Sequence, residues 1–459
     1  MSRLTYDTHS NLLKENYYTY TVQDVPEPNL FPDFFDYAQI PRVAFNQRLV
    51  PMHMPEEIFI TDTTFRDGQQ SREPFTPKQI AQIFTYLHRL SGPHGVVRQC
   101  EFFVYSEQDR RAIELCRLKG YKFPEITTWI RATEKDFDLV KELGVSETGI
   151  LVSCSDYHIF KKLNMTRKQA MEQYLSVVKM ALERGIRPRC HFEDITRADF
   201  YGFVVPFAHA LERLSEDAGI PIKIRCCDTL GLGVSYPGAS LPRSVPGIIY
   251  GLRHYANINS TLLEWHGHND FYKVVTNAAS AWLYGASGVN CSILGIGERT
   301  GNCPLEAMVM EYCSLRGRTD DMELSVLTEL ADYFTNDIGY DIPPQTPFMG
   351  RDFCSTRAGI HADGLQKDAR IYSIFDTGAI LNRPNVVKVD AHSGLAGIAY
   401  WMNLNHVLPG DIQKSDPLVA AIKEKVDANY DAGRTTALSD AEMQAICDAV
   451  MAGSAPCRE

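Results

Sequence analysis

Residues 265–270, WHGHND, hold two histidines separated by one glycine. In a β-strand, residues two apart face the same side, so His266 and His268 are expected to point in one direction. Two neutral imidazoles at this spacing can bind one divalent cation and create a Lewis-acid centre. Taken alone, however, the pair fits two structural histidines at a strand end equally well.

Two further polar residues favour the metal interpretation. Asp67 follows the first predicted strand, in TDTTFRDGQQ (61–70), and Asn302 lies just after the eighth. One carboxylate, two imidazoles and an amide oxygen leave positions open for water or substrate, whereas a structural zinc site would need thiolates at a spacing that this chain lacks. We therefore predict that Asp67, His266, His268 and Asn302 bind a divalent metal cation.

The glycine-rich stretch GIGERTG (295–301) precedes Asn302. It lacks the GxGxxG spacing of a dinucleotide-binding loop, and the order of the elements around it is wrong for one. We interpret it as a tight turn that places Asn302, with Glu298 and Arg299 as an internal ion pair.

These residues need a scaffold that brings strand ends together. From residue 56, short apolar runs alternate with longer amphipathic segments, which predicts an α/β fold and, more narrowly, a (β/α)8 TIM barrel. A doubly wound open sheet is the alternative. In a barrel, catalytic side chains collect at the carboxyl ends of the strands, where the residues above lie. The apolar runs are 57–62, 97–104, 125–130, 147–154, 187–193, 221–227, 261–268 and 288–295.

The alternation of strands and helices covers only part of the chain. Residues 1–55 are rich in aromatic residues and prolines and are predicted to form an N-terminal arm. Residues 56–320 would form the TIM-barrel catalytic domain, 321–385 a linker subdomain and 386–459 a mainly helical C-terminal subdomain.

Composition narrows the class of protein further. The formal net charge of −11 argues against a general nucleic-acid or anionic-membrane surface. Twelve cysteines are scattered without a CxxC pair, which is typical of reduced thiols. No stretch has the apolar length of a signal-peptide core or of a membrane span of about 18 residues. We expect a cytoplasmic protein whose partners are small molecules, not nucleic acid or a membrane.

The stretches DTTFRDGQQ, HGHND and GIGERTGN, in this order, resemble the metal-dependent Claisen-condensing enzymes with a (β/α)8 barrel. This family includes the 2-isopropylmalate, homocitrate, citramalate and Re-type citrate synthases. The similarity extends from about residue 57 to about residue 400. The resemblance implies an acyltransferase that condenses acetyl-CoA with a 2-oxo acid. It also implies a divalent metal cation, with Mn²⁺ as first choice and Mg²⁺ or Co²⁺ as alternatives.

The resemblance also assigns roles to single residues. Asp67, His266 and His268 match the metal ligands, and Asn302 lies in or near the coordination shell. Arg66 matches the arginine beside the reacting carbonyl oxygen, and Glu193 matches a catalytic carboxylate. The positions that hold the 2-oxo acid are matched by Gln70, Arg131 and Thr229.

A segment after the barrel, GIHADGLQKDARIY (359–372), matches the part of the family that supplies a catalytic histidine and tyrosine. Those residues would be His361 and Tyr372. In the family this segment reaches into the barrel of a partner subunit, which implies an obligate homodimer.

The substrate is indicated by departures from the isopropylmalate enzymes. Phe271, Tyr272 and Lys273 follow HND where small or aliphatic residues are usual, and such a polar rim suits a second carboxylate. Arg131 or a basic residue near Lys273 would bind it. The pattern resembles the Re-type citrate synthases, which use oxaloacetate; 2-isopropylmalate, homocitrate and phosphinomethylmalate synthases are alternatives.

Two other classes of function stay open from the residues alone: a lyase on the same scaffold, and a non-catalytic metal-binding protein. Ionisable residues at several strand ends speak against the second. On the fifth predicted strand we expect Glu193 to face the barrel interior and His191 to face away. For His158, contact with substrate and capping of a helix are equally compatible with the sequence.

Overall fold

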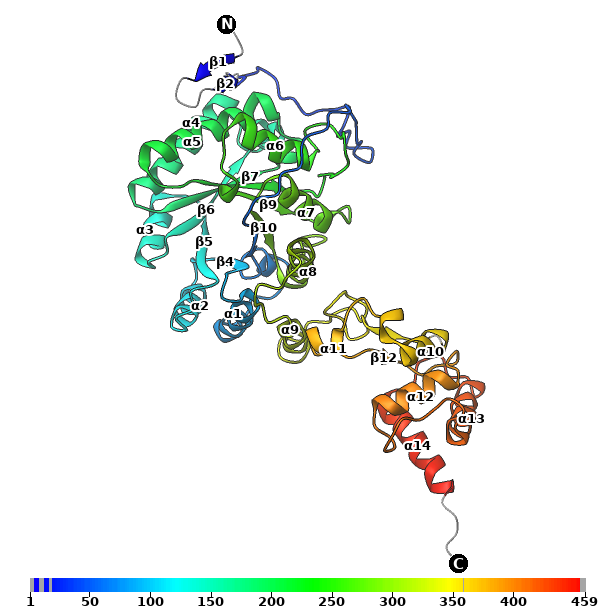
Figure 1. Ribbon diagram of the computed structural model, residues 1–459. Coiled ribbons are helices and arrows are strands. Elements are labelled where there is room, and N and C mark those ends of the chain that lie inside the picture. Colours follow the sequence, from blue (N-terminus) through cyan, green and yellow to red (C-terminus); the bar gives the residue numbers. More distant parts are fainter. Residues whose placement is uncertain (1–3, 8–11, 16–18, 358, 455–459) are drawn as a thin grey trace, which may run out of the picture. The chain divides into compact units, whose positions relative to one another are not determined.

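The computed structural model describes residues 4–7, 12–15, 19–357 and 359–454, and the chain divides into two compact units, Met1–Glu323 and Leu324–Glu459. The core of the first unit is a closed barrel of parallel strands in the order β10-β3-β4-β5-β6-β7-β8-β9 (Figure 1). The predicted TIM barrel is thereby confirmed, and the open doubly wound sheet is wrong. The strands are β3 (Phe59–Asp62), β4 (Val97–Phe102), β5 (Glu125–Ile130), β6 (Glu147–Ser153), β7 (Arg187–Glu193), β8 (Lys223–Asp228), β9 (Leu263–Gly267) and β10 (Gly288–Cys291).

Helices surround this barrel (Figure 1). Several begin at a capping box, in which a Ser or Thr side chain accepts from the third helical amide and the third side chain accepts from the capping residue's amide. The boxes are formed by Thr76, Ser106, Thr133 and Thr166. The helices are α1 (Pro77–Ser91), α2 (Glu107–Arg117), α3 (Glu134–Glu142), α4 (Arg167–Glu183), α5 (Val205–Ala218), α6 (Val245–Tyr255), α7 (Val274–Tyr284) and α8 (Leu305–Arg316).

Charged side chains fill the barrel interior below its mouth, where branched apolar residues are usual. Arg189 Nη1 lies 2.8 Å from Glu147 Oε1, and Arg225 Nε lies 2.9 Å from Glu264 Oε2. Arg225 Nη1 is also 3.1 Å from Glu101 Oε1. Burial alone would raise the pKa of Glu101, but Arg225 and Arg189 outweigh it and lower that pKa to about 2. We call these five buried residues the ionic floor.

Residues 19–55 of the N-terminal arm contain almost no regular secondary structure and run along the barrel unit (Figure 1). It is fixed to loops that follow the strands. After β6, Asp156 Oδ2 accepts from Asn29 N at 2.7 Å. After β8, Arg243 Nη1 donates to Pro41 O at 2.8 Å. The arm therefore supports the loops at the mouth of the barrel. Before it lies a hairpin of β1 (Leu4–Asp7) and β2 (Leu12–Glu15).

The second unit is mainly helical. Its last three helices pack around a core that includes Ile398, Trp401, Val419, Ile422 and Cys447. A two-stranded parallel sheet, β11 (Ser355–Thr356) with β12 (Val386–Val387), precedes them. The helices are α9 (Val326–Asn336), α10 (Gly359–Lys367), α11 (Thr377–Leu381), α12 (Leu395–Leu404), α13 (Pro417–Asp431) and α14 (Asp440–Ser454).

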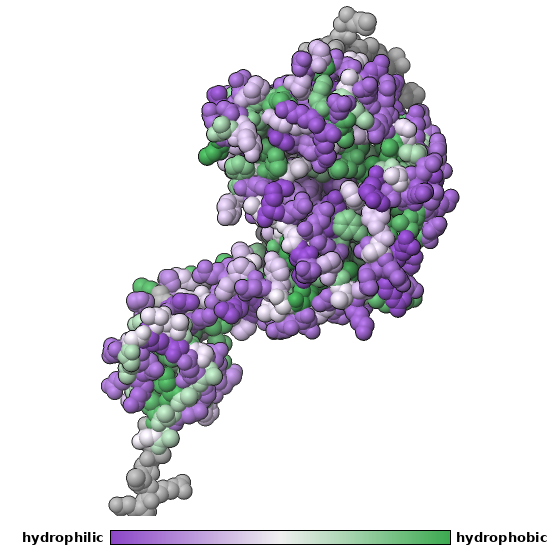
Figure 2. Space-filling view, turned by 180° about the vertical axis from the view of Figure 1, so that it is seen from behind, coloured by the Kyte–Doolittle hydropathy of each residue, from purple (hydrophilic) through white to green (hydrophobic). Residues whose placement is uncertain are grey.

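Hydrophilic side chains cover most of the face of each unit that Figure 2 shows, and hydrophobic ones lie in scattered patches. Such scattered apolar residues are normal at a protein surface. Within the described ranges, no helix combines the length and the apolar character that crossing a membrane would require.

Candidate active site

The four predicted metal ligands come together at the mouth of the barrel. His266 Nε2 lies 3.2 Å from His268 Nε2 and 3.8 Å from Asp67 Oδ2. Asn302 Nδ2 donates to Asp67 Oδ2 at 3.3 Å, and the backbones of His268 and Asn302 form a β-bridge. The ends of β9, the loop after β3 and the turn after β10 thus contribute to one polar cluster.

Both imidazoles of the cluster are neutral. Burial, reinforced by the neighbouring His268, lowers the pKa of His266 well below its usual value. For His268, burial and then the Arg299 guanidinium lower the pKa to about 4. His266 Nδ1 donates to Asn290 Oδ1 at 2.8 Å, so its Nε2 turns a lone pair toward the cluster. This is the tautomer that a metal-binding histidine needs.

The donor chemistry of the cluster fits a divalent cation. Two ligands that are each about 2.1 Å from an octahedral cation lie about 3 Å apart, which matches the separation of 3.2 Å between the two histidine nitrogens. Asn302 Oδ1 is buried and has no hydrogen-bond partner.

One oxygen of the Asp67 carboxylate is already paired, because Asp67 Oδ1 contacts the Arg66 guanidinium. In the part of the chain that the structure describes, no three or more His, Cys, Asp or Glu side chains are arranged so that they could hold a metal ion.

Arg66 lies beside this cluster. Its Cζ atom is 4.5 Å from the ring centroid of Trp129, and its Nε is 3.9 Å from Glu101 Oε2 in the ionic floor. Burial lowers the pKa of Arg66, although Glu101 opposes the shift. Arg66 Nε and Trp129 Nε1 are both buried donors without a hydrogen-bond partner. A buried donor without a partner suits an anionic acceptor.

Trp129 was not identified from the sequence, nor was its position near β7. Its side chain and that of His191 both lie over Gly149. A Cβ atom on Gly149 would lie 2.7 Å from His191 Nε2 and 2.8 Å from Trp129 Cδ1. The prediction that His191 faces away from the interior is wrong. Residues two apart on a strand share a face, and His191 Nε2 lies 3.6 Å from Glu101 Oε1.

Glu193, the predicted catalytic carboxylate, lies at the end of β7 among hydrogen-bond donors. His158 Nδ1 is 3.0 Å and Lys162 Nζ 3.5 Å from Glu193 Oε2, and the Ser153 hydroxyl donates to the same oxygen. Burial would raise the pKa of Glu193, but these groups, His158 foremost, lower it to about 2. Glu193 is therefore ionised at any physiological pH.

The predicted substrate-binding residues are placed unevenly. Gln70 follows Asp67 on a 3-10 turn, its backbone N–H donating to Asp67 O at 3.1 Å. Thr229 Oγ1 accepts from Asp194 N at 2.8 Å, next to Glu193. Arg131, by contrast, lies 4.3 Å from the Tyr105 ring, and its side chain is 67% exposed. The structure does not bring Arg131 to the cluster.

The turn at residues 295–301 differs in detail from the expectation. Arg299 pairs with Asp270, Nε to Oδ1 at 2.9 Å, so the expected ion pair with Glu298 is wrong. Arg299 Nη2 also donates to Thr229 O at 2.6 Å. It therefore connects the loops that follow β8, β9 and β10. Lys273 donates to Phe271 O at 3.3 Å and remains at the rim.

His361 and Tyr372 come together in the second unit. Their ring centroids are 4.4 Å apart, and Thr356 Oγ1 lies 3.4 Å from His361 Nδ1. Both line a pocket of about 220 Å³, together with Ser355, Leu365, Ser373 and Asn385 among others. The two residues thus form one polar pocket, as a shared catalytic role requires.

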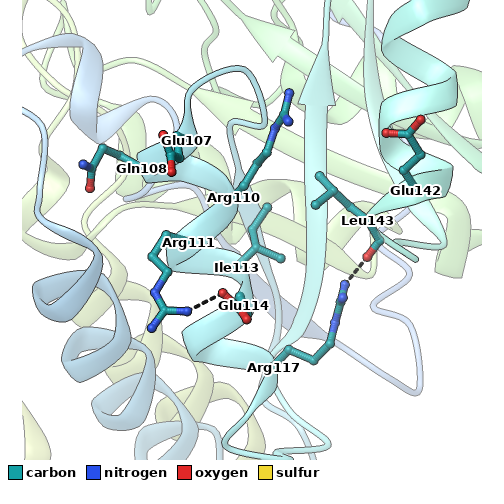
Figure 3. A pocket seen from close by; sticks show the side chains of 9 residues that line it. All are labelled: Glu107, Gln108, Arg110, Arg111, Ile113, Glu114, Arg117, Glu142 and Leu143. Atoms are coloured by element: carbon teal, nitrogen blue, oxygen red, sulfur yellow. Dashed lines mark hydrogen bonds and ion pairs between the residues drawn. The ribbon is translucent and has the colours of Figure 1, made fainter.

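A larger hollow lies elsewhere. It is an open groove of about 650 Å³ lined by α2 and the end of α3 (Figure 3). Arg111 in it pairs with Glu114, Nη1 to Oε2 at 2.5 Å, and Arg117 donates to Leu143 O. The groove contains none of the candidate residues, and these two arginines already have partners, so we do not assign the active site to it.

Glu306, in the first turn of α8, supports the loop before Asn302 and gives a testable pH dependence. Its Oε2 accepts from Leu294 N at 3.0 Å, and burial raises its pKa to about 7. An unfolded glutamate titrates near pH 4.3, so between about pH 4 and 7 the folded state binds more protons and stability falls as pH rises.

We expect Glu306→Gln to remove this loss, which is at most about 1.4 kcal/mol per pH unit for one proton. The variant should have a higher denaturation midpoint than the wild type at pH 8 and a similar one at pH 4. Urea titrations at both pH values measure this, with the exposed Glu172→Gln as control. Equal pH slopes for all three proteins would contradict the prediction.

Neutral imidazoles, a carboxylate and buried arginines lie together at the strand ends of this barrel. This arrangement defines the class of (β/α)8 proteins whose reactive groups lie at the mouth of the barrel. The HMGL-like family matches residues 57–333, and the chain belongs to this family. It is 56% identical to the citrate (Re)-synthase of Clostridium kluyveri, over 96% of this chain and 97% of that protein. The resemblance drawn from three short stretches is confirmed.

Two further relatives extend the comparison. The citrate (Re)-synthase of Syntrophus aciditrophicus is 52% identical over 94% of this chain and 68% of its own length. The 2-phosphinomethylmalate synthase of Streptomyces hygroscopicus is 37% identical over 94% of this chain and 98% of its own length. The similarity therefore includes both units of the chain, not the barrel alone.

Proposed function

We propose that this protein is an acyltransferase that condenses acetyl-CoA with oxaloacetate to give citrate and CoA. The observation that carries the proposal is the 56% identity to the Clostridium kluyveri citrate (Re)-synthase along nearly the whole of both chains. The mouth of the barrel supports it, because it gathers the residue types that a Claisen condensation needs.

His266, His268, Asp67 and Asn302 would hold the metal. A divalent cation there, with Mn²⁺ as our first choice and Mg²⁺ or Co²⁺ as alternatives, would polarise the carbonyl group of the 2-oxo acid. Arg66 adds a fixed positive charge for the oxygen on which negative charge develops. Gln70 and Thr229 are our candidates for holding the 2-oxo acid, whereas Arg131 would have to leave Tyr105 to reach it.

We assign the proton transfers to His361 and Tyr372, supplied by a partner chain. A carboxylate with a pKa of about 2 is a weak base, so Glu193 orients rather than abstracts. His361 takes a proton from the acetyl methyl group, and the carbanion attacks the keto carbon of oxaloacetate. The keto oxygen takes up a proton and becomes the citrate hydroxyl. Water then cleaves the thioester and releases CoA.

We further propose that the active form is a homodimer that works in the cytoplasm. The compartment is supported by the cysteines, since every cysteine in the described ranges is free. The dimer is supported by the position of His361 and Tyr372 on a unit separate from the barrel.

Oxaloacetate is expected to be preferred over 2-oxoisovalerate by a factor of about a hundred or more in kcat/KM. A pocket for a second carboxylate leaves its buried donors, such as Trp129 Nε1, unpaired when an isopropyl group enters. Each stranded polar group typically costs about 1–3 kcal/mol.

The measurement is thiol release from acetyl-CoA with a panel of 2-oxo acids, with the product identified as citrate. A higher kcat/KM for 2-oxoisovalerate than for oxaloacetate would indicate a 2-isopropylmalate synthase instead. Phosphinomethylmalate or homocitrate synthesis would show as a preference for another acid in the panel. Absence of any release would favour a lyase or a non-catalytic metal-binding protein.

A further inference from the structure

His158 lies on a π-helical turn, η2 (Tyr157–Lys162), that follows β6. Its Nδ1 is 3.0 Å from Glu193 Oε2, and its Nε2 is 3.7 Å from Asp194 Oδ2. The imidazole therefore bridges the last residue of β7 and the residue after it. It does not cap a helix, so one of the two roles open from the sequence is excluded.

His158 is better placed than its neighbours to orient Glu193. The Lys162 side chain is 53% exposed, so its charge is screened by water. The His158 side chain is only 17% exposed, and interactions of buried groups are screened much less. The Ser153 hydroxyl donates to the same oxygen from the end of β6. His158 Nδ1, at 3.0 Å from Glu193 Oε2 and on a largely buried side chain, is thus placed to fix the direction of the carboxylate.

The N-terminal arm holds the turn that carries His158 through hydrogen bonds. Asp156, immediately before the turn, is buried and is bound by Arg167 through two hydrogen bonds of 2.9 and 2.7 Å. The arm donates to the same carboxylate through Asn29 N at 2.7 Å. Tyr157 OH, in the turn itself, donates to Leu30 O of the arm at 2.9 Å. The arm therefore forms hydrogen bonds along one side of the turn.

We propose that His158 is a positioning residue for the Glu193 carboxylate, and that arm residues Asn29 and Leu30 hold the turn that carries it. This inference rests on the catalytic role proposed for Glu193. The arm would thus be part of the catalytic apparatus without touching substrate, because its backbone sets the place of the imidazole.

Kinetics of His158 variants test the first half. His158→Ala should lower kcat about 10–100-fold, the usual cost of losing a group that orients a reacting residue, and leave the KM for oxaloacetate nearly unchanged. His158→Asn keeps an N–H donor near the place of Nδ1 and should recover most of the loss. Unchanged kcat in the alanine variant, or no recovery in the asparagine variant, would overturn the positioning role.

Hydrogen exchange tests the second half without any need for activity. Tyr157→Phe removes the hydroxyl that donates to Leu30 O, and Ser240→Ala is the matched control, since its hydroxyl donates to arm residue Ala44 O, at 3.2 Å, far along the arm from the turn. The amides of Leu163 and Met165, which donate within the turn, should exchange about fivefold faster in Tyr157→Phe only.

Equal exchange in both variants would overturn the role of the arm. A wild-type protein that makes no citrate while Tyr157→Phe still loosens the turn would reject the proposed function and not the contact between arm and turn. Normal citrate synthesis by the wild type, together with an unaltered turn in Tyr157→Phe, would reject the contact between arm and turn and not the proposed function.

Discussion

His268→Ala is expected to lower kcat/KM about a thousandfold or more and to abolish stoichiometric metal binding. The variant removes one of two neutral imidazoles whose nitrogens face each other at 3.2 Å. Lewis-acid assistance to a carbonyl is worth several kcal/mol, and each 1.36 kcal/mol is about a tenfold change in rate. A loss of this size distinguishes a metal ligand from a histidine that only packs at a strand end.

Metal content after dialysis and gel filtration is the first measurement, and thiol release from acetyl-CoA is the second. His94→Ala serves as control, because His94 is exposed and pairs only with Asp321 at 3.6 Å. Circular dichroism shows whether the barrel is intact. Full metal content and full activity in His268→Ala would reject the assignment of the cluster.

Mixing two inactive variants should restore activity if the site is shared between subunits. Asp67→Ala removes a barrel residue of the cluster, and His361→Ala removes the proposed base, whose loss should cost about 10²–10⁴-fold. After subunit exchange, about half of the dimers are mixed, and each mixed dimer has one intact site. About a quarter of the wild-type activity is therefore expected.

Exchange itself must be shown independently, by mass spectrometry of differently tagged chains. Mixing Asp67→Ala with His268→Ala is the matched control, since both changes lie in the same barrel and no dimer gains an intact site. Proven exchange without recovery in the first mixture would mean that each site is built within one chain. Recovery in both mixtures would contradict the shared site as well.

Much of the mouth could be predicted because strand ends are simple to locate. Parallel strands bring their carboxyl ends to one side, so Asp67, His266 and Asn302 had to meet if the barrel was right. Side chains alternate between the two faces of a strand, so His268 was expected on the same face as His266. Both inferences need only the order of the elements and the side-chain alternation along a strand.

Contacts across the barrel could not be predicted in this way. Trp129 and His191 both occupy space over Gly149, on the strand between them, which a larger side chain at that position would fill. Arg131 lies against the Tyr105 ring just after β5, where Ala132 has φ 65°, a left-handed conformation that no local residue preference predicts. His158 was left open because a π-helical turn, and not a regular helix, carries it.

The ionic floor has a consequence for how such a barrel can evolve. Removing one member of a buried ion pair leaves an uncompensated charge, at a cost of about 3–5 kcal/mol, which is a large part of the stability of a typical protein. Arg225 forms ion pairs with both Glu101 and Glu264. A substitution at any of these three residues would therefore need a second, compensating substitution at one of its partners. New substrate ranges are therefore more accessible through the layer above, at positions such as Trp129, than through the floor. Directed evolution of this barrel should begin at that layer, and libraries that vary the floor should vary its partners together.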